Sequence, residues 1–337
     1  MSDYTVAIVG AGVIGTSLGL ALKQRGDEFR VLAHDKELGQ AKEAVKMGAF
    51  DKAEWNLINA SEPADLILLA LPLSAIRPTL EAIAPYLKQD VVISDTCNNK
   101  EAVLVWANEL LPDHAHFVGG NPIVQPGGTG YKHARADLFQ NRLYCLTPAP
   151  AAHEGAVQLM VGLVALLGAE PFFLDPTEHD GLITSVEYLP HLLGVALLRT
   201  LSEQTSWREI RKLAGGLFER VSSGAEGDPD ALSESFLNNR ETLIYWVDAY
   251  LNQLRGLRQL LASKDLAEPE EREQLAQIVD KAVVDRRNWL NDYQKGEFLD
   301  PELSGPNVET PGLLNQMVGF GGLRKRFGAS PKDKKTD

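Results

Sequence analysis

Residues 5–26 read "TVAIVGAGVIGTSLGLALKQRG", and this stretch decides the fold. Its first five residues are a continuous, mostly β-branched apolar run, which predicts a buried strand. "GAGVIG" follows at once, and the apolar residues after it have the spacing of a helix. The order of strand, glycine-rich turn and helix is that of the first half of a βαβ unit.

The glycines have the spacing G-x-G-x-x-G, in which each has a separate role. The first makes the turn, the second lets a pyrophosphate approach the backbone, and the third lets helix and strand pack closely. The unpaired N–H groups at the start of the helix then face the phosphates. We therefore predict a dinucleotide site; a tight turn without a ligand is the alternative. Its predicted residues are Gly10, Gly12, Val13, Ile14 and Gly15.

Asp35 ends the second predicted strand, twenty residues after Gly15. A carboxylate there accepts hydrogen bonds from the 2′-hydroxyl of an adenosine ribose and repels a 2′-phosphate. The sequence therefore favours NAD as the cofactor, with NADP as the less favoured alternative because His34 and Lys36 flank the carboxylate. Asp35 could also cap the helix that follows, and the two roles are compatible.

Strands and helices continue to alternate as far as residue 176. Apolar strand-like runs occupy residues 64–72, 90–95, 116–120 and 142–148, and helical patterns separate most of them. Alternation of this kind predicts an α/β domain over residues 1–176, a Rossmann-type doubly wound parallel sheet with helices on both faces.

Two loops follow predicted strands at the edge of the sheet where ligands collect. Leu71 and Pro72 end one strand beside the expected position of a nicotinamide, although the proline could simply terminate the strand. Asn98 and Lys100 lie in "SDTCNNK" after the next strand and are candidate pocket residues. Surface turn chemistry would equally explain the asparagines.

Beyond residue 176 the strand pattern stops, and apolar residues at three and four spacing run from about residue 183 to 293. This predicts a C-terminal all-helical domain over residues 177–297. The Leu-, Tyr- and Trp-rich helix around residues 244–261 is either core or a self-association face. Residues 298–337 are predicted to be a polar tail; a nucleic-acid role for its basic end, residues 322–337, is a weak alternative.

The composition is that of a soluble globular protein, with 44% hydrophobic and 23% charged residues. No apolar run approaches the roughly 20 residues of a bilayer span, and no signal peptide is recognised. Two cysteines give neither a disulfide framework nor a metal-ligand spacing. The net charge of −13 argues against general affinity for nucleic acid or anionic lipid. We expect a cytoplasmic protein without metal, membrane or nucleic-acid partners.

Several stretches between residues 5 and about 260 together resemble one family, the prephenate and arogenate dehydrogenases of tyrosine biosynthesis. They are "ALP", "SDTCNNK", "NPIVQPGGTG", "ADLFQNRLYCLTP" and "EHDGLITSVEYLPH". The resemblance implies oxidation of a ring carbinol with NAD or NADP while the ring loses carboxylate. It also implies a helical domain that forms a homodimer and closes the pocket of a small-molecule substrate.

The chain departs from the family pattern at its catalytic positions. Asn121 stands where the family has the histidine that takes the substrate hydroxyl proton, and Asn98 stands where it has a serine. Tyr188 replaces the first histidine of the family's "SHLPH", whereas His191, the second, is retained. By this resemblance the catalytic candidates are Asn121, Asn98, Tyr188 and His191.

The resemblance also identifies candidate substrate-binding residues. The family arginine that pairs with the substrate's side-chain carboxylate lies shortly before an Asp-Pro, and Ser223 occupies that place here. Arg220 is close enough in the sequence to substitute for it. His179 is a further candidate, with a helix-start role beside Asp180 as its alternative, and His191 could be a core histidine.

These observations lead to one hypothesis with two rivals. The chain is predicted to be an NAD-dependent oxidoreductase resembling prephenate/arogenate dehydrogenase, with an altered substrate left open as an alternative. The first rival is a dehydrogenase of the same fold that acts on another hydroxy acid. The second is a non-catalytic NAD-binding protein.

Overall fold

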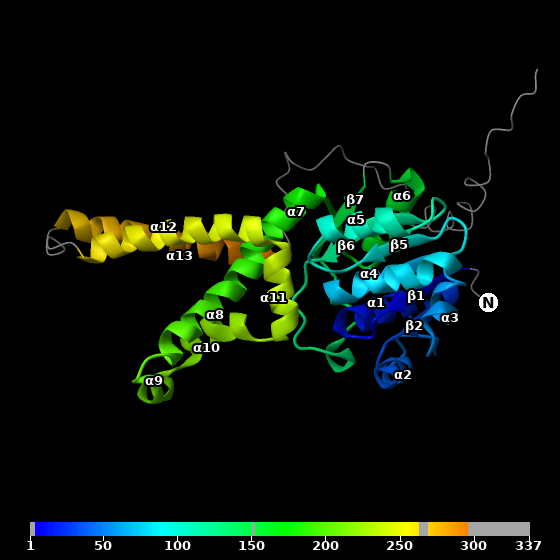
Figure 1. Cartoon of the computed structure of the whole chain (residues 1–337), viewed down its shortest axis with the longest axis horizontal. Coiled ribbons are helices and arrows are strands. Elements are labelled where there is room, and N and C mark those ends of the chain that lie inside the picture. The colour runs from blue at the N-terminus through cyan, green and yellow to red at the C-terminus, as the bar shows by residue number, and fades with distance from the viewer. Residues whose placement is uncertain (1–3, 150–151, 263–268, 296–337) are drawn as a thin grey trace, which may run out of the picture. The chain divides into compact units, whose positions relative to one another are not determined.

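The computed structural model describes residues 4–149, 152–262 and 269–295 (Figure 1). Within them the chain divides into two compact units, residues 4–180 and residues 181–295. The tail predicted over residues 298–337, including its basic end, lies outside the described residues.

The first unit is built on an eight-stranded sheet with the order β3-β2-β1-β4-β5-β6-β7-β8. The strands are β1 (Thr5–Val9), β2 (Arg30–His34), β3 (Lys52–Ala53), β4 (Leu66–Leu69), β5 (Val92–Asp95), β6 (His116–Pro122), β7 (Leu143–Pro148) and β8 (Glu170–Phe173). The order reverses at β1, as in a doubly wound sheet. The α/β prediction is confirmed with one difference, because β7 pairs antiparallel to β6.

Helices cover both faces of this sheet (Figure 1). They are α1 (Val13–Lys23), α2 (Leu38–Lys46), α3 (Leu57–Ser61), α4 (Leu73–Ile83), α5 (Glu101–Leu110) and α6 (Glu154–Leu166), with 3₁₀ turns at Gly26–Glu28, Ala84–Tyr86 and Tyr131–His133. α7 (Pro176–Ile183) follows β8. Alternate residues of β1 point to opposite faces. Val6 and Ile8 pack in the cluster that contains α1 and α6, and Ala7 and Val9 pack in the cluster that contains α4 and α5.

The described elements of the second unit are all helical. They are a π-helix (Thr184–Tyr188), α8 (Leu189–Ser202), α9 (Trp207–Leu213), α10 (Gly216–Ser222), a 3₁₀ turn (Ser223–Ala225), α11 (Pro229–Asn238), α12 (Arg240–Ala262) and α13 (Pro269–Lys295). α12 and α13 lie side by side along much of their length (Figure 1). The prediction of an all-helical C-terminal part is confirmed.

α8 and the 3₁₀ turn after α10 pack with their backbones almost in contact. A Cβ on Gly194 would lie 2.9 Å from the Cα of Gly224, and a Cβ on Gly224 would lie 2.5 Å from the carbonyl oxygen of Pro190. Only glycines allow this approach, because any side chain there would overlap backbone atoms. The close packing joins the two segments that carry His191 and Ser223.

One helical stretch of the described residues, Pro176–Ser202, is long and apolar enough by length and composition to cross a membrane. This finding corrects the expectation that no apolar run approaches the length of a bilayer span, although it rests on length and composition only. The stretch nevertheless begins with His179 and Asp180, which are buried and hydrogen-bonded to other polar groups of the first unit. Only 22% of its apolar window is buried within the chain.

Candidate functional site

The glycine-rich loop between β1 and α1 has the geometry that its spacing predicts. Gly10 has φ +102°, and its N–H donates to the carbonyl oxygen of His34 at 2.8 Å. A Cβ on Gly15 would lie 1.9 Å from the carbonyl oxygen of Gly10, so helix and turn are in direct contact. A Cβ on Gly12 would meet nothing within 4 Å. The backbone is therefore open at the position where a pyrophosphate would approach.

The start of α1 fits the same ligand. The helix begins at Val13, and its N-cap, Gly12, offers no side-chain hydrogen bond to the first N–H groups. The N–H groups of Val13 and Ile14 thus keep the donor capacity and positive dipole end that bind phosphates. The loop residues present therefore fit a dinucleotide.

Asp35 follows β2 and is tied to the glycine-rich loop. Its Oδ2 accepts from the N–H of Ala11 at 2.7 Å, and its Oδ1 accepts from the N–H of Glu37 at 2.7 Å. The N-cap of α2 is Glu37, so Asp35 closes the turn before the helix and does not cap the helix itself. Half-buried beside Ala11, the carboxylate keeps lone pairs for a ribose hydroxyl.

Leu71 and Pro72 follow β4 beside this loop. A Cβ on Gly10 would lie 2.2 Å from the carbonyl oxygen of Ala70 and 3.3 Å from Cδ2 of Leu71. Pro72 is the N-cap of α4, so it both ends the strand segment and starts the helix. Pro72 therefore does terminate the strand, as the alternative interpretation expected. This position is also compatible with a bound nicotinamide lying beside it.

Asn121 lies near the C-terminal end of β6 and is 1% exposed. Its Nδ2 lies 3.1 Å from Nε2 of His179, which is 0% exposed and sits on α7. The other ring nitrogen of His179, Nδ1, lies 2.8 Å from Oδ1 of Asp180. Asn121 and His179, 58 positions apart in the sequence, thus belong to one hydrogen-bond network with Asp180.

Asp180 connects this hydrogen-bond network to the N-terminus of α5. Its Oδ1 accepts from the N–H of Lys100 at 2.7 Å, and its Oδ2 accepts from the N–H of Glu101 at 3.0 Å. A carboxylate is stabilised there by unpaired helix N–H groups. His179 therefore has a defined bonding role and is not merely a residue at the start of a helix.

Lys100 was a candidate pocket residue, and the structure corrects this expectation. Its side chain is fully buried, and Nζ forms an ion pair with Asp95 and donates to the carbonyl oxygen of Gly120 at 2.7 Å. Burial is the largest single effect and acts to lower the pKa of Lys100, but the charges of its buried neighbours, Asp95 first, and the hydrogen bond to Asp95 together raise it. Lys100 supports the backbone directly before Asn121 and cannot reach a ligand.

Asp95 is the centre of this buried cluster. It accepts from the N–H of Gly120 at 3.2 Å and from the Sγ of Cys97 at 2.9 Å. Burial, followed by the negative charge of Asp95, raises the pKa of the Cys97 thiol, which makes this cysteine unreactive. Asn98, half-buried in the same loop, lies at the same sheet edge as Asn121, because it follows the neighbouring strand.

The helical unit carries the other predicted site residues. Nδ1 of His191 lies 2.6 Å from the carbonyl oxygen of Gly224, so Nδ1 donates and the neutral ring keeps an acceptor at Nε2. Tyr188, 7% exposed, belongs to the π-helix, a distortion that is frequent at functional sites. Ser223 donates from Oγ to the carbonyl oxygen of Arg220 at 2.9 Å, and both residues are exposed.

Two residues of the site, Asp95 and Asp180, were missed as functional positions. Asp95 ends a predicted strand, which was a usable signal for a position at the ligand edge. Asp180 was seen only as the neighbour of His179, since no sequence pattern relates it to α5.

Among the described residues, no group of three or more His, Cys, Asp or Glu side chains is arranged to hold a metal ion.

Family models match both parts of the chain. The model described as "Prephenate dehydrogenase, nucleotide-binding domain" matches residues 18–172, and "Prephenate dehydrogenase, dimerization domain" matches residues 175–279. Prephenate dehydrogenase of Bacillus subtilis (strain 168) is 26% identical over 319 residues, covering 93% of this chain and 84% of the relative. Cyclohexadienyl dehydrogenase of Zymomonas mobilis is 28% identical over 262 residues, covering 77% and 89%.

Solved structures show the same fold. Prephenate dehydrogenase from A. aeolicus, in complex with hydroxyphenyl propionate and NAD+, superposes with a TM-score of 0.75 at 24% identity, covering 84% of this chain and 98% of that one. Synechocystis arogenate dehydrogenase gives a TM-score of 0.70 at 24% identity, covering 85% and 99%. With both of its parts matched by models of one family, this chain belongs to the prephenate dehydrogenase family.

Proposed function

We propose that this chain oxidises prephenate or arogenate, with loss of the ring carboxylate and transfer of a hydride to NAD. As a member of the family it is an NAD-dependent oxidoreductase. The observation that supports the substrate assignment is the position of Asn121. Its amide is fixed near the end of β6, at the same edge of the parallel strands as the glycine-rich loop after β1. A group there can hold the hydroxyl of a carbinol beside the cofactor.

Different residues of the first unit would bind the cofactor and the substrate. NAD, when bound, supplies the acceptor for the hydride that leaves the carbinol carbon. Val13 and Ile14 would bind its pyrophosphate through their N–H groups, and Asp35 would accept from its ribose hydroxyls. Asn121 would orient the substrate hydroxyl, with Asn98 at the same edge as a second polar contact.

Asn121 cannot itself accept the hydroxyl proton, because a neutral amide is a very weak base. His191 is the proposed proton acceptor, since its Nδ1 is engaged by the carbonyl oxygen of Gly224 and its Nε2 keeps a lone pair. A bound water is the alternative acceptor. Replacing His191 with Asn would separate the two, because turnover would fall strongly only if the histidine accepts the proton.

The proposed function is tested by a substrate and cofactor panel. The purified protein is given prephenate, arogenate and a set of other hydroxy acids, each with NAD and with NADP, and the reduced cofactor is followed by absorbance. Turnover of prephenate or arogenate with NAD is expected. Tight NAD binding in a parallel titration, with turnover only of another hydroxy acid, would reject the proposed substrate.

A dehydrogenase for another hydroxy acid is the second candidate, and Ser223 favours it. The family resemblance places there an arginine for the substrate's side-chain carboxylate, and a serine cannot form that ion pair. Arg220 lies one turn earlier on α10, but its side chain is exposed. A substrate without the side-chain carboxylate would need no such arginine.

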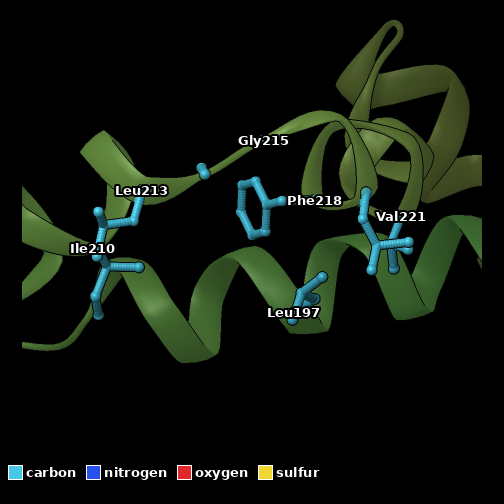
Figure 2. A pocket seen from close by; sticks show the side chains of 8 residues that line it. Leu197, Ile210, Leu213, Gly215, Phe218 and Val221 are labelled. Atoms are coloured by element: carbon cyan, nitrogen blue, oxygen red, sulfur yellow. The ribbon is translucent and has the colours of Figure 1, made fainter.

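We further propose that the protein is a homodimer formed through its helical unit. α8, α9 and α10 surround an apolar hollow of about 560 Å³ lined by Leu197, Ile210, Leu213, Ala214, Gly215, Leu217, Phe218 and Val221 (Figure 2). Leu213 is 88% exposed and Leu217 is 71% exposed within one chain. Since the matching family model is a dimerization domain, a second copy is the occupant that fits this surface.

The cytoplasm is the proposed location. Cys97 and Cys145 are free and buried, and burial raises the pKa of Cys145 to about 12, so neither thiol depends on an oxidising compartment. The apolar surface of Pro176–Ser202 is attributed to contact with a second copy and not to a bilayer. Fractionation of cells that express the tagged protein tests this assignment.

A further inference from the structure

The carboxylate of Asp180 determines which ring nitrogen of His179 carries a proton. It accepts from two backbone N–H groups, those of Lys100 and Glu101, at 2.7 and 3.0 Å. A backbone N–H can only donate, so Asp180 acts as an acceptor on both oxygens. The same Oδ1 faces Nδ1 of His179 at 2.8 Å, and Nδ1 must therefore carry a proton.

The bond to Asp180 fixes the tautomer of His179. In a neutral imidazole only one nitrogen carries a proton, so with Nδ1 protonated Nε2 presents a lone pair. His179 is completely buried, which removes water as an alternative partner for either nitrogen. The ring thus presents an acceptor to whatever lies beside Nε2.

The group beside Nε2 is the amide of Asn121, at 3.1 Å. Only the NH₂ side of an amide can donate to a lone pair, so Nδ2 faces His179 and Oδ1 faces the other way. Within the part of the chain that the structure describes, no hydrogen bond engages Oδ1. The contact with His179 uses one of the two N–H groups of Nδ2, and Oδ1 is the acceptor that the side chain offers to a ligand.

We propose that His179, oriented by Asp180, is a positioning residue that sets the direction of the Asn121 amide, so that this position accepts a hydrogen bond from a substrate hydroxyl and discriminates against ligands without a donor there. The inference rests on the proposed function for the identity of the ligand as a cyclic or aromatic acid with a hydroxyl. The direction of the amide rests only on contacts within the first unit.

The arrangement has a consequence for specificity. Asn121 is almost completely buried, and a ligand that places a carbonyl or fluorine against Oδ1 leaves two acceptors facing each other without water between them. The penalty for an unsatisfied buried polar group corresponds to about ten- to a hundredfold in affinity. The carbinol form of a substrate is thereby preferred over a ketone of similar shape.

Two aromatic acids of nearly equal size serve as probes. 3-(4-Hydroxyphenyl)propanoate carries a donor at the ring position para to the side chain, and 3-(4-fluorophenyl)propanoate carries none. Each is titrated calorimetrically into the protein saturated with NAD. We expect the hydroxy compound to bind about tenfold or more tightly than the fluoro compound. An equal affinity would overturn the proposed discrimination.

His179→Phe tests the positioning role, because it removes the Nε2 lone pair while keeping a buried ring. The preference for the hydroxy compound is expected to fall toward one, while NAD affinity stays within about twofold of that of the unmodified protein. His114→Phe is the matched control, since His114 lies before the amino end of β6 and bonds the carbonyl oxygen of Leu87. An unchanged preference in His179→Phe would overturn the proposal.

A loss of NAD affinity in folded His179→Phe, with the ligand preference unchanged, would likewise overturn it. That result would mean that Oδ1 of Asn121 accepts hydrogen bonds from the carboxamide N–H groups of the cofactor and not from the substrate hydroxyl. Asn121→Leu gives an independent measurement, because it removes Oδ1 directly and is expected to abolish the preference.

The tautomer of His179 can be observed without any substitution. Nitrogen-15 NMR of protein labelled at histidine is expected to show His179 neutral with its proton on Nδ1. A proton on Nε2 would overturn the proposal whatever the ligand. If neither aromatic acid binds while NAD does, the proposed function fails, and this spectrum still decides the direction of the amide.

Discussion

In the proposed reaction Asn121 would limit the rate, because its amide would hold the substrate hydroxyl without removing the proton. Asn121→His would place a base at this position, and a positioned base contributes roughly 10² to 10⁴ in rate. We expect the turnover number for prephenate to rise about tenfold or more. Steady-state kinetics at saturating NAD measure it, with His114→Phe as a control expected to leave the rate unchanged. No increase in a folded variant would contradict the place given to this loop.

We propose that Asp35 determines which cofactor is preferred, since its carboxylate lies against the glycine-rich loop and would repel a 2′-phosphate. Asp35→Ser removes the charge but keeps a short polar side chain. We expect the Kd for NAD to rise about tenfold and the ratio of NADP to NAD affinity to increase, as measured by fluorescence titration of both reduced cofactors. A variant that keeps the original ratio would show that another residue selects the cofactor.

The site residues that could be predicted from the sequence are those whose partners are local. Gly10, Gly15 and Asp35 follow from spacing, because the turn and the next strand position them. The contact between Asn121 and His179 has no such signal, since it depends on how α7 packs against the end of β6. The sequence also does not show which loop residues are buried. Lys100, a charged residue in a predicted loop, is fully buried and supports the backbone instead of contacting a ligand.

At the scale of elements, the crossing of α8 with the 3₁₀ turn at Gly224 holds His191 in place. Gly224→Ala would bring a Cβ within 2.5 Å of the carbonyl oxygen of Pro190 and force the two segments apart. We expect a loss of about 1–3 kcal/mol in the free energy of unfolding, measured with denaturant. Turnover should fall as well, because the bond to His191 is stretched.

Gly256→Ala is the matched control for that substitution. Gly256 lies inside α12, and a Cβ there would meet nothing within 4 Å. Alanine at such a site is expected to stabilise the helix by roughly 0.5–1 kcal/mol. Equal effects of the two substitutions on stability would show that the crossing at Gly224 is looser than described.

The order of elements was predictable, but the direction of one strand was not. An apolar run marks "RLYCLTP" as a strand, yet such a run reads the same in either direction, and β7 runs antiparallel to β6. The π-helix at Thr184–Tyr188 was also not predicted, because no residue pattern in the sequence marks it. The short strand β3 is too brief to produce a pattern.

At the scale of the whole molecule, the proposed homodimer has a second copy covering the apolar hollow between α8, α9 and α10. Leu217→Glu would place a charge in this surface and is expected to give monomers at micromolar concentration, as measured by light scattering after gel filtration. Trp55→Glu is the control, since Trp55 is equally exposed, at 71%, but belongs to the nucleotide-binding unit. A Leu217→Glu protein with the mass of the unmodified one would reject this surface as the dimer contact.

The central claim is that this chain, with an amide in place of the expected histidine, remains an NAD-dependent dehydrogenase for prephenate or arogenate. The most direct test is NADH formation by the purified protein with each of these two substrates, beside an NAD binding titration on the same sample. The account predicts NADH formation with at least one of them, together with release of one carbon dioxide for each NADH. NAD binding without formation of NADH from either substrate would contradict it.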